Sequence, residues 1–302
     1  LNAITGRLSL RAPQEESLYA LAKTLDAAPD MLKKERALDS LQKAISAEFP
    51  TLTDFEREFP SLCFALATGV GKTRLMGAFI SYLHLACGIK NFFVLAPNLT
   101  IYNKLIADFT PNYPKYVFKG IAEFAAYPPQ VVTGDNYESA ATGDILSPVT
   151  INIFNIAKIN SEIRGGKAPR IKRLRETIGD SYFNYLANLP DLVMLMDESH
   201  RYRASAGVRS LNELNPLMGL ELTATPFTEG NRGPVPFKNV VVDYPLARAM
   251  DDGFVKEPAV VTQRNFNASQ YSAERLERIK LEDGIRLHES TKVELFTYAK
   301  QQ

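Results

Sequence analysis

The feature that most constrains the fold is a series of short apolar runs without polar alternation. These runs cover residues 61–66, 91–97, 130–135, 149–154, 192–198 and 219–225. A strand with one wet face alternates apolar and polar residues, whereas a strand covered on both faces is apolar throughout. The runs therefore predict a mostly parallel β-sheet that is buried on both faces.

Helical patterns lie between several of these runs, over residues 72–86, 98–110 and 172–188. Alternating strands and helices are typical of a doubly wound α/β domain, whose active groups lie at the carboxyl ends of the strands. We expect this domain over residues 51–258. A helical N-terminal segment is expected over residues 1–50, and a connector to a part of the protein absent from this chain over residues 259–302.

Composition excludes some classes of protein. The hydrophobic fraction of 45% and charged fraction of 23% are those of an ordinary globular protein, and the net charge of +1 excludes a uniformly basic nucleic-acid binder. A local basic groove stays possible. No run is long enough for a membrane span, no signal-peptide pattern is present, and Cys63 and Cys87 have no metal-binding spacing. We therefore expect a cytoplasmic protein with buried free thiols.

A glycine-containing stretch, "ATGVGKT", follows the first strand and opens a helix. Gly69 and Gly71 allow a tight turn whose backbone N–H groups surround an anion at the helix start. Lys72 can reach the β and γ phosphates, and the Thr73 hydroxyl can bind Mg²⁺. The general P-loop signature has a glycine six residues before the lysine, but this chain has Leu66 at that position. A turn that merely caps an ordinary helix is therefore the alternative. The expected nucleotide-binding residues are Thr68, Gly69, Val70, Gly71, Lys72 and Thr73.

A pair of acidic residues, Asp197 and Glu198, ends the apolar strand "LVMLM". Adjacent carboxylates behind an apolar strand are costly unless a cation or a helix dipole compensates their charge. Phosphoryl transfer to water needs a carboxylate that holds the metal and a group that activates the water. We expect Asp197 to hold Mg²⁺ and Glu198 to activate water; the alternative is a strand that simply ends in solvent.

Four elements, which follow one another along the chain in the same order as in the family, resemble the motifs of superfamily 2 helicases and translocases. "DESH" resembles the DExH box, "TATP" resembles motif III, "VLAPNLTI" resembles motif Ia, and "LRAPQ" resembles the glutamine element that recognises adenine. The resemblance implies a RecA-like P-loop NTPase fold that uses ATP and Mg²⁺. It also implies that Gln14 reads adenine, and that His200 acts with Lys72, Asp197 and Glu198 in the catalytic centre. Thr223, Ala224 and Thr225 would couple the ATP site to nucleic acid.

Nucleic-acid contacts are expected from two loops at strand ends. Motif Ia implies contacts from Pro97 and Asn98, and Thr133 with Gly134 resembles the family's next DNA-backbone loop. Thr100 and Lys104 on the helix that follows are further candidates for phosphate oxygens. An N-terminal helix cap with a solvated helix face, and a simple turn, are the alternatives. The basic stretch over residues 164–175 could bind a duplex backbone, although a solvated insertion is favoured.

Within this superfamily the chain is most similar to the Res subunit of type III restriction enzymes. Its style of P-loop, its box "DESHRYRA" and the segment "YPLARAMDDGFVKEP" carry this resemblance. The resemblance implies the first RecA-like motor lobe of an enzyme that hydrolyses ATP and translocates on duplex DNA. The implied partners are a second RecA-like lobe, a nuclease domain and a modification and recognition subunit. An RNA or other superfamily 2 helicase, and a nucleotide-gated interaction module in a defence complex, are the alternatives.

Overall fold

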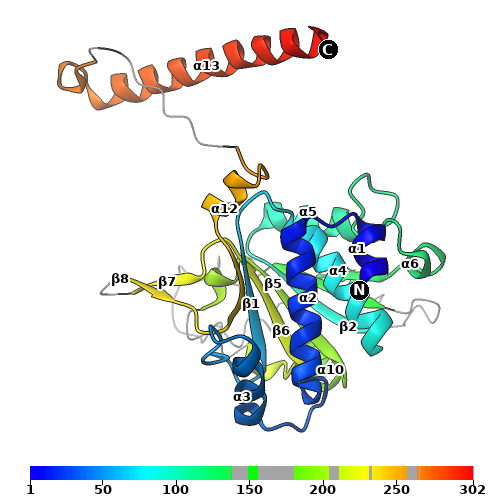
Figure 1. Ribbon diagram of the computed structural model, residues 1–302. Helices are drawn as coiled ribbons and strands as arrows, with labels where there is room; N and C mark the ends of the chain where they lie inside the picture. The colour runs from blue at the N-terminus through cyan, green and yellow to red at the C-terminus, as the bar shows by residue number, and fades with distance from the viewer. Residues whose placement is uncertain are drawn as a thin grey trace. The chain divides into compact units, whose positions relative to one another are not determined.

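A seven-stranded sheet forms the centre of the first part of the chain (Figure 1). The computed structural model describes residues 1–134, 136–137, 149–155, 180–203, 211–230, 233–256, 264 and 266–301. The chain divides into two compact units, Leu1–Lys256 and Glu257–Gln302. The strand order is β3-β4-β2-β5-β6-β1-β9, and every neighbouring pair runs parallel.

Each of the six predicted runs forms a strand, and their bounds differ from the predicted ones by two residues at most. The strands are β1 (Ser61–Leu66), β2 (Asn91–Ala96), β3 (Gln130–Thr133), β4 (Thr150–Asn155), β5 (Leu192–Asp197) and β6 (Met218–Thr223). The edge strand β9 (Val240–Tyr244) was not predicted. The parallel α/β fold class is confirmed.

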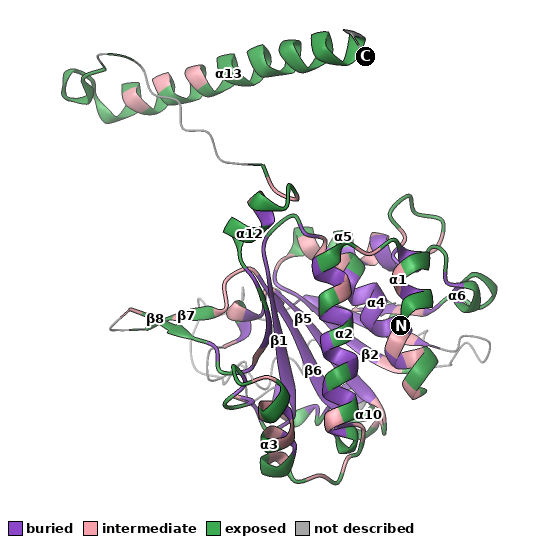
Figure 2. Ribbon diagram, in the orientation of Figure 1, coloured by how far each residue is buried: buried purple, intermediate pink, exposed green. Residues whose placement is uncertain are grey.

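Side chains of successive strand residues enter two separate cores, because the period of a strand is two. Phe92 and Val94 of β2 pack on one face with the N-terminal helices, whereas Phe93 and Leu95 pack on the other face. Figure 2 shows the strands buried along most of their length. This is why the runs in the sequence have no polar alternation.

Helices cover both faces of the sheet in the first unit. They are α1 (Asn2–Leu8), α2 (Ala12–Ala27), α3 (Leu38–Glu48), α4 (Lys72–Cys87), α5 (Leu99–Phe109), α6 (Ala122–Ala126), α10 (Asp180–Asn188) and α12 (Leu246–Asp251). The helical N-terminal segment expected over residues 1–50 consists of α1, α2 and α3, and the break after Ala27 lies next to Pro29, which starts a short 3-10 helix, η1 (Pro29–Leu32). Proline disfavours a helical conformation in the residue before it, which explains the break.

A β-hairpin in the first unit and the helices of the second unit lie outside the central sheet. The strands β7 (Phe227–Gly230) and β8 (Gly233–Pro236) form an antiparallel hairpin directly after "TATP". The second unit contains η4 (Ala268–Gln270) and the long helix α13 (Ala273–Gln301), which includes the charged helical stretch expected there. None of the helices described is both long and apolar enough to cross a membrane.

Some predicted features lie outside the described residues. They are residue 135, the basic stretch 164–175, the first part of the helix predicted over 172–188, and residues 259–263 and 265 of the expected connector.

Candidate functional site

The predicted functional residues meet at one edge of the sheet. Strand β6 lies between β1 and β5, so the loops that follow these three neighbouring strands share the carboxyl edge. These loops are the glycine loop after β1, the acidic pair that ends β5 and the "TATP" segment that ends β6. Such an edge is where doubly wound sheets bind their ligands.

The glycine loop joins β1 to α4 with two residues in the left-handed region. Gly69 has a φ of +90° and Gly71, which precedes the first residue of α4, has a φ of +99°. A Cβ atom at Gly71 would lie 2.5 Å from Nε2 of Gln14, so Gln14 would have to shift, and the left-handed backbone conformation strains any residue with a side chain there. The N-terminal amides of α4 remain available to bind an anion.

Gln14 and Arg11, from the start of α2, hold the glycine loop from outside. The Gln14 amide donates to the carbonyl oxygens of Val70 at 3.1 Å and Gly71 at 2.9 Å, and Arg11 donates to the carbonyl of Gly69 at 3.0 Å. Gln14 also accepts a hydrogen bond from the Arg11 backbone at 2.8 Å. The role of Gln14 as a reader of adenine stays a prediction. What the structure adds is its contact with the loop, which sequence reasoning missed.

A cavity of about 350 Å³ lies where Gln14 and Arg11 contact the glycine loop. The residues around it are Ser9, Arg11, Gln14, Gly69, Val70, Gly71 and Arg74. Polar side chains and the glycine loop backbone therefore surround a space next to the expected phosphate site.

The acidic pair lies opposite the lysine of the glycine loop. Nζ of Lys72 is 3.2 Å from Oε1 of Glu198, and Glu198 has a left-handed φ of +51°. Asp197 is buried, and its Oδ1 atom has no hydrogen-bond partner among the described residues. Burial, together with the charge of Glu198, raises the pKa of Asp197 to about 6, although Lys72 and Lys104 oppose this effect.

These groups fit a magnesium nucleotide. The buried Asp197 oxygen, which has no partner in the described part of the chain, and the hydroxyl of Thr73 at the start of α4 are hard oxygen donors of the kind that Mg²⁺ prefers. No group of three or more His, Cys, Asp or Glu side chains that could hold a metal occurs among the described residues. A site with few protein ligands suits Mg²⁺, which usually takes one or two carboxylates and completes its shell with phosphates and water.

His200 connects the acidic pair to the end of β6. It lies in the 3-10 helix η3 (Ser199–Tyr202), and its Nδ1 atom is 2.9 Å from the hydroxyl oxygens of both Thr223 and Thr225. The same nitrogen is 3.6 Å from Oε2 of Glu198. Burial lowers the pKa of His200, so its imidazole is neutral at pH 7. Ala224 occupies the bend between the two threonines.

The predicted nucleic-acid residues lie at the same edge of the sheet, after β2 and β3. Pro97 follows β2, and Asn98 caps α5 by accepting a hydrogen bond from the Ile101 amide at 2.9 Å. The Thr133 amide donates to Asn136 at 2.7 Å, and Gly134 lies in the turn between them. Their contacts in this structure are those of a helix cap and a turn, and their contact with nucleic acid stays a prediction.

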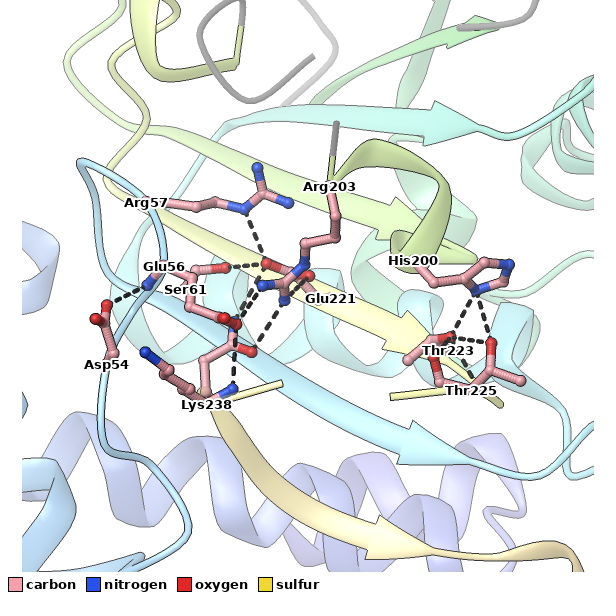
Figure 3. A network of polar contacts seen from close by, with 11 residues as sticks. Asp54, Glu56, Arg57, Ser61, His200, Arg203, Glu221, Thr223, Thr225 and Lys238 are labelled. Atoms are coloured by element: carbon pink, nitrogen blue, oxygen red, sulfur yellow. Dashed lines mark hydrogen bonds and ion pairs between the residues drawn. The ribbon is translucent and has the colours of Figure 1, made fainter. Parts of the chain in front are cut away.

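Sequence reasoning missed a buried ionic network behind the DExH segment (Figure 3). Glu221 of β6 accepts hydrogen bonds from Arg57 at 2.8 Å, Ser61 at 2.7 Å and Arg203 at 2.6 Å. Arg203 also pairs with Glu56 and lies over the Phe237 ring at 3.7 Å. A single glutamate inside the apolar run "GLELT" was the signal that could have revealed it. Arg203 follows η3 directly, and its hydrogen bond to Glu221 connects this segment to β6, the strand that also carries Thr223.

The protein has a RecA-like α/β fold, and a glycine loop that opens a helix lies at the carboxyl edge of its parallel sheet. A family model described as "Type III restriction enzyme, res subunit" matches residues 7–228. The chain therefore belongs to this family, as the motifs predicted.

Solved structures with a similar fold come from larger DNA-associated enzymes. One is a nuclease-deletion mutant of the Type ISP restriction-modification enzyme LlaGI in complex with a DNA substrate mimic, with 14% identity, a TM-score of 0.44, and coverage of 74% of this chain and 21% of that chain. Another is the Sulfolobus solfataricus SWI2/SNF2 ATPase core in complex with dsDNA, with 16% identity, a TM-score of 0.33, and coverage of 55% and 28%. The chain thus spans less than a third of either. No curated protein sequence matches it.

Proposed function

We propose that this chain is the first motor lobe of a Res-type restriction subunit, which hydrolyses ATP and translocates on duplex DNA. The observation that carries the proposal is the arrangement at the carboxyl edge of the sheet. The P-loop lysine, Lys72, lies 3.2 Å from Glu198, beside a buried Asp197 oxygen that has no partner among the described residues. A metal-holding carboxylate, a phosphate-binding lysine and a second carboxylate are the groups that hydrolysis of a nucleoside triphosphate requires.

Each residue then has a distinct task. The amides around Gly69 and Gly71 and the ammonium group of Lys72 bind the phosphates, while Thr73 and Asp197 hold Mg²⁺. The metal ion, when bound, neutralises charge that develops on the phosphate oxygens. Glu198 accepts a proton from the attacking water once Lys72 has turned from Glu198 to a phosphate.

Coupling to nucleic acid is assigned to the contact between η3 and the end of β6. His200 lies within reach of Glu198 on one side and of Thr223 and Thr225 on the other. A change at Glu198 can therefore reach the "TATP" segment through one side chain. Ala224 is proposed to act in this coupling with Thr223 and Thr225. The residues proposed to contact nucleic acid are Pro97, Asn98, Thr133 and Gly134.

The family description supports duplex DNA as the substrate, since a restriction enzyme acts on DNA. The partners we propose are a second RecA-like lobe, a nuclease domain and a modification and recognition subunit, in the cytoplasm. Arginines from the second lobe would complete the ATP site, and groups of this kind are worth roughly 10³ to 10⁵ in rate. We therefore expect poor hydrolysis by these residues alone.

The test is ATP turnover by the full-length protein that carries this chain, measured alone, with duplex DNA and with RNA. Glu198→Gln is the catalytic variant. Glu123→Gln is the control, because Glu123 is exposed and pairs with Arg7 at the surface at 3.7 Å. DNA-stimulated turnover that is lost in Glu198→Gln and kept in the control is expected.

Two other results would each overturn part of the proposal. Stimulation by RNA and not by DNA would favour an RNA helicase. Tight Mg-ATP binding without turnover under any condition would favour a nucleotide-gated interaction module.

A further inference from the structure

Lys104 contacts one of the two residues expected to bind the metal ion. Its ammonium group, on α5, donates to the hydroxyl oxygen of Thr73 at 3.0 Å and pairs with Asp108 at 3.1 Å. The positive charge of Lys104 also acts on Asp197, where it opposes the rise in the pKa of that carboxyl group. Lys104 therefore acts on both Thr73 and Asp197, although it comes from a different helix.

Each of the two lysines of the site forms an ion pair with a carboxylate. Lys72 lies against Glu198, and Lys104 lies between Thr73 and Asp108. Asp108 is itself buried, so the ammonium group of Lys104 has a fixed anchor on its own helix. These two ammonium groups place positive charge beside the carboxylates and the hydroxyl group that they contact.

Lys104 and a metal ion compete for the same place. The Thr73 oxygen that accepts the Lys104 hydrogen bond is the oxygen that would ligate Mg²⁺. A divalent cation a few ångströms from an ammonium group is also repelled by it. Lys104 can move away at low cost, because about half of its side chain is exposed and the ion pair with Asp108 needs no contact with Thr73.

We propose that Lys104 is a cation surrogate in the nucleotide site, and that Mg-nucleotide binding expels its ammonium group from Thr73 so that it becomes available to a phosphate of duplex DNA. The inference rests on the proposed function, because it requires that Mg-nucleotide binds at Thr73 and Asp197. It assigns Lys104 a second role beyond a phosphate contact, and it makes α5, the helix after motif Ia, responsive to the metal.

The first test is the affinity of the full-length protein for a fluorescent ATP analogue, with Mg²⁺ and with EDTA. Lys104→Met keeps most of the aliphatic stem and removes the charge. Lys119→Met is the matched control, since Lys119 is an exposed lysine of the same unit. We expect Lys104→Met to bind the Mg-nucleotide about twofold to fivefold more tightly, the range for an ion pair of a half-exposed lysine. The control should be unchanged, and the gain should disappear in EDTA.

The sign of the change makes the test decisive. Weaker Mg-nucleotide binding by Lys104→Met would mean that Lys104 is itself a phosphate ligand, and would overturn the inference. An unchanged affinity, or an equal gain in EDTA, would overturn it as well, because neither shows competition with the metal. If the unaltered protein fails to bind Mg-nucleotide, the proposed function fails with it.

The second test measures duplex DNA affinity against salt, with and without the Mg complex of a non-hydrolysable ATP analogue. A released Lys104 adds one phosphate contact, which steepens the log–log salt slope by about 0.9. We expect this nucleotide-dependent steepening in the unaltered protein and in Lys119→Met, but not in Lys104→Met. An equal change of slope in all three proteins would overturn the release to DNA.

Discussion

Replacement of Glu221 by glutamine tests whether the network behind the DExH segment stabilises the fold. Glu221 lies in β6, is completely buried, and accepts hydrogen bonds from both Arg57 and Arg203. The substitution keeps the shape but removes the charge, which leaves two buried guanidinium groups with Glu56 as their remaining carboxylate partner among the described residues.

The expected loss can be worked out from the pKa of Glu221. Burial alone would raise this pKa, but Arg57, Arg203 and the hydrogen bond from Ser61 lower it from 4.5 to about 2. At about 1.4 kcal/mol per pKa unit, this difference corresponds to roughly 3 kcal/mol of stability at neutral pH. Removal of one partner from a buried ion pair costs about 3 to 5 kcal/mol, which agrees with this value.

Urea denaturation at pH 7 gives the free energy of unfolding for the parent protein, Glu221→Gln and the surface control Glu123→Gln. The control should lose less than about 0.5 kcal/mol. Because the pKa of Glu221 is lowered in the folded state, its contribution is complete above pH 4.5 and is lost as the pH falls from 4.5 towards about 2. The parent protein should therefore lose stability over that pH range. A loss below about 1 kcal/mol in Glu221→Gln at pH 7 would refute the reasoning.

Three further predictions concern the nucleotide site. Asp197→Asn should stabilise the nucleotide-free protein at pH 7 by about 2 to 3 kcal/mol, because burial raises the pKa of this carboxyl group from 3.8 to about 6. A lower melting temperature of the variant without Mg²⁺ would contradict this. In the parent protein, Mg-nucleotide affinity should fall as the pH drops below about 6, since Asp197 then gains a proton; titrations at a series of pH values measure it, and a flat profile would argue against Asp197 as a ligand. Gly71→Ala should abolish nucleotide binding while the protein stays folded, because the residue has a φ of +99° and its Cβ would lie 2.5 Å from Gln14. Gly6→Ala is the control, since nothing lies within 4 Å of a Cβ atom at Gly6. Circular dichroism checks the fold of both variants.

Most of the sheet could be predicted because its strands are buried on both faces. The side chains of β2 enter both cores, so the run from Asn91 is apolar at nearly every position. The edge strand β9 escaped prediction, although it contains "VVVDY". Its register on β1 is irregular near Cys63, and tertiary pairing decides whether so short a run forms a strand.

The glycine loop and the acidic pair could be located from the sequence because each is formed by residues that are close together in the chain. The network around Glu221 could not, since Arg57 lies 164 positions away and no spacing rule connects the two. The contact of Lys104 with Thr73 likewise depends on how α5 packs beside α4. The hydrogen bonds from Gln14 to the glycine loop depend on how α2 packs on α4.

The position of β6 has a mechanical consequence. This strand is hydrogen-bonded on both sides, to β1 and to β5, and it carries both Glu221 and Thr223. A slip by one residue would turn every side chain of β6 to the opposite face, including the charge of Glu221. The strand is therefore held in register between β1, which precedes the P-loop, and β5, which ends in the DExH box. The coupling proposed above therefore requires rotation of side chains such as those of His200 and Thr225, and not sliding of the sheet.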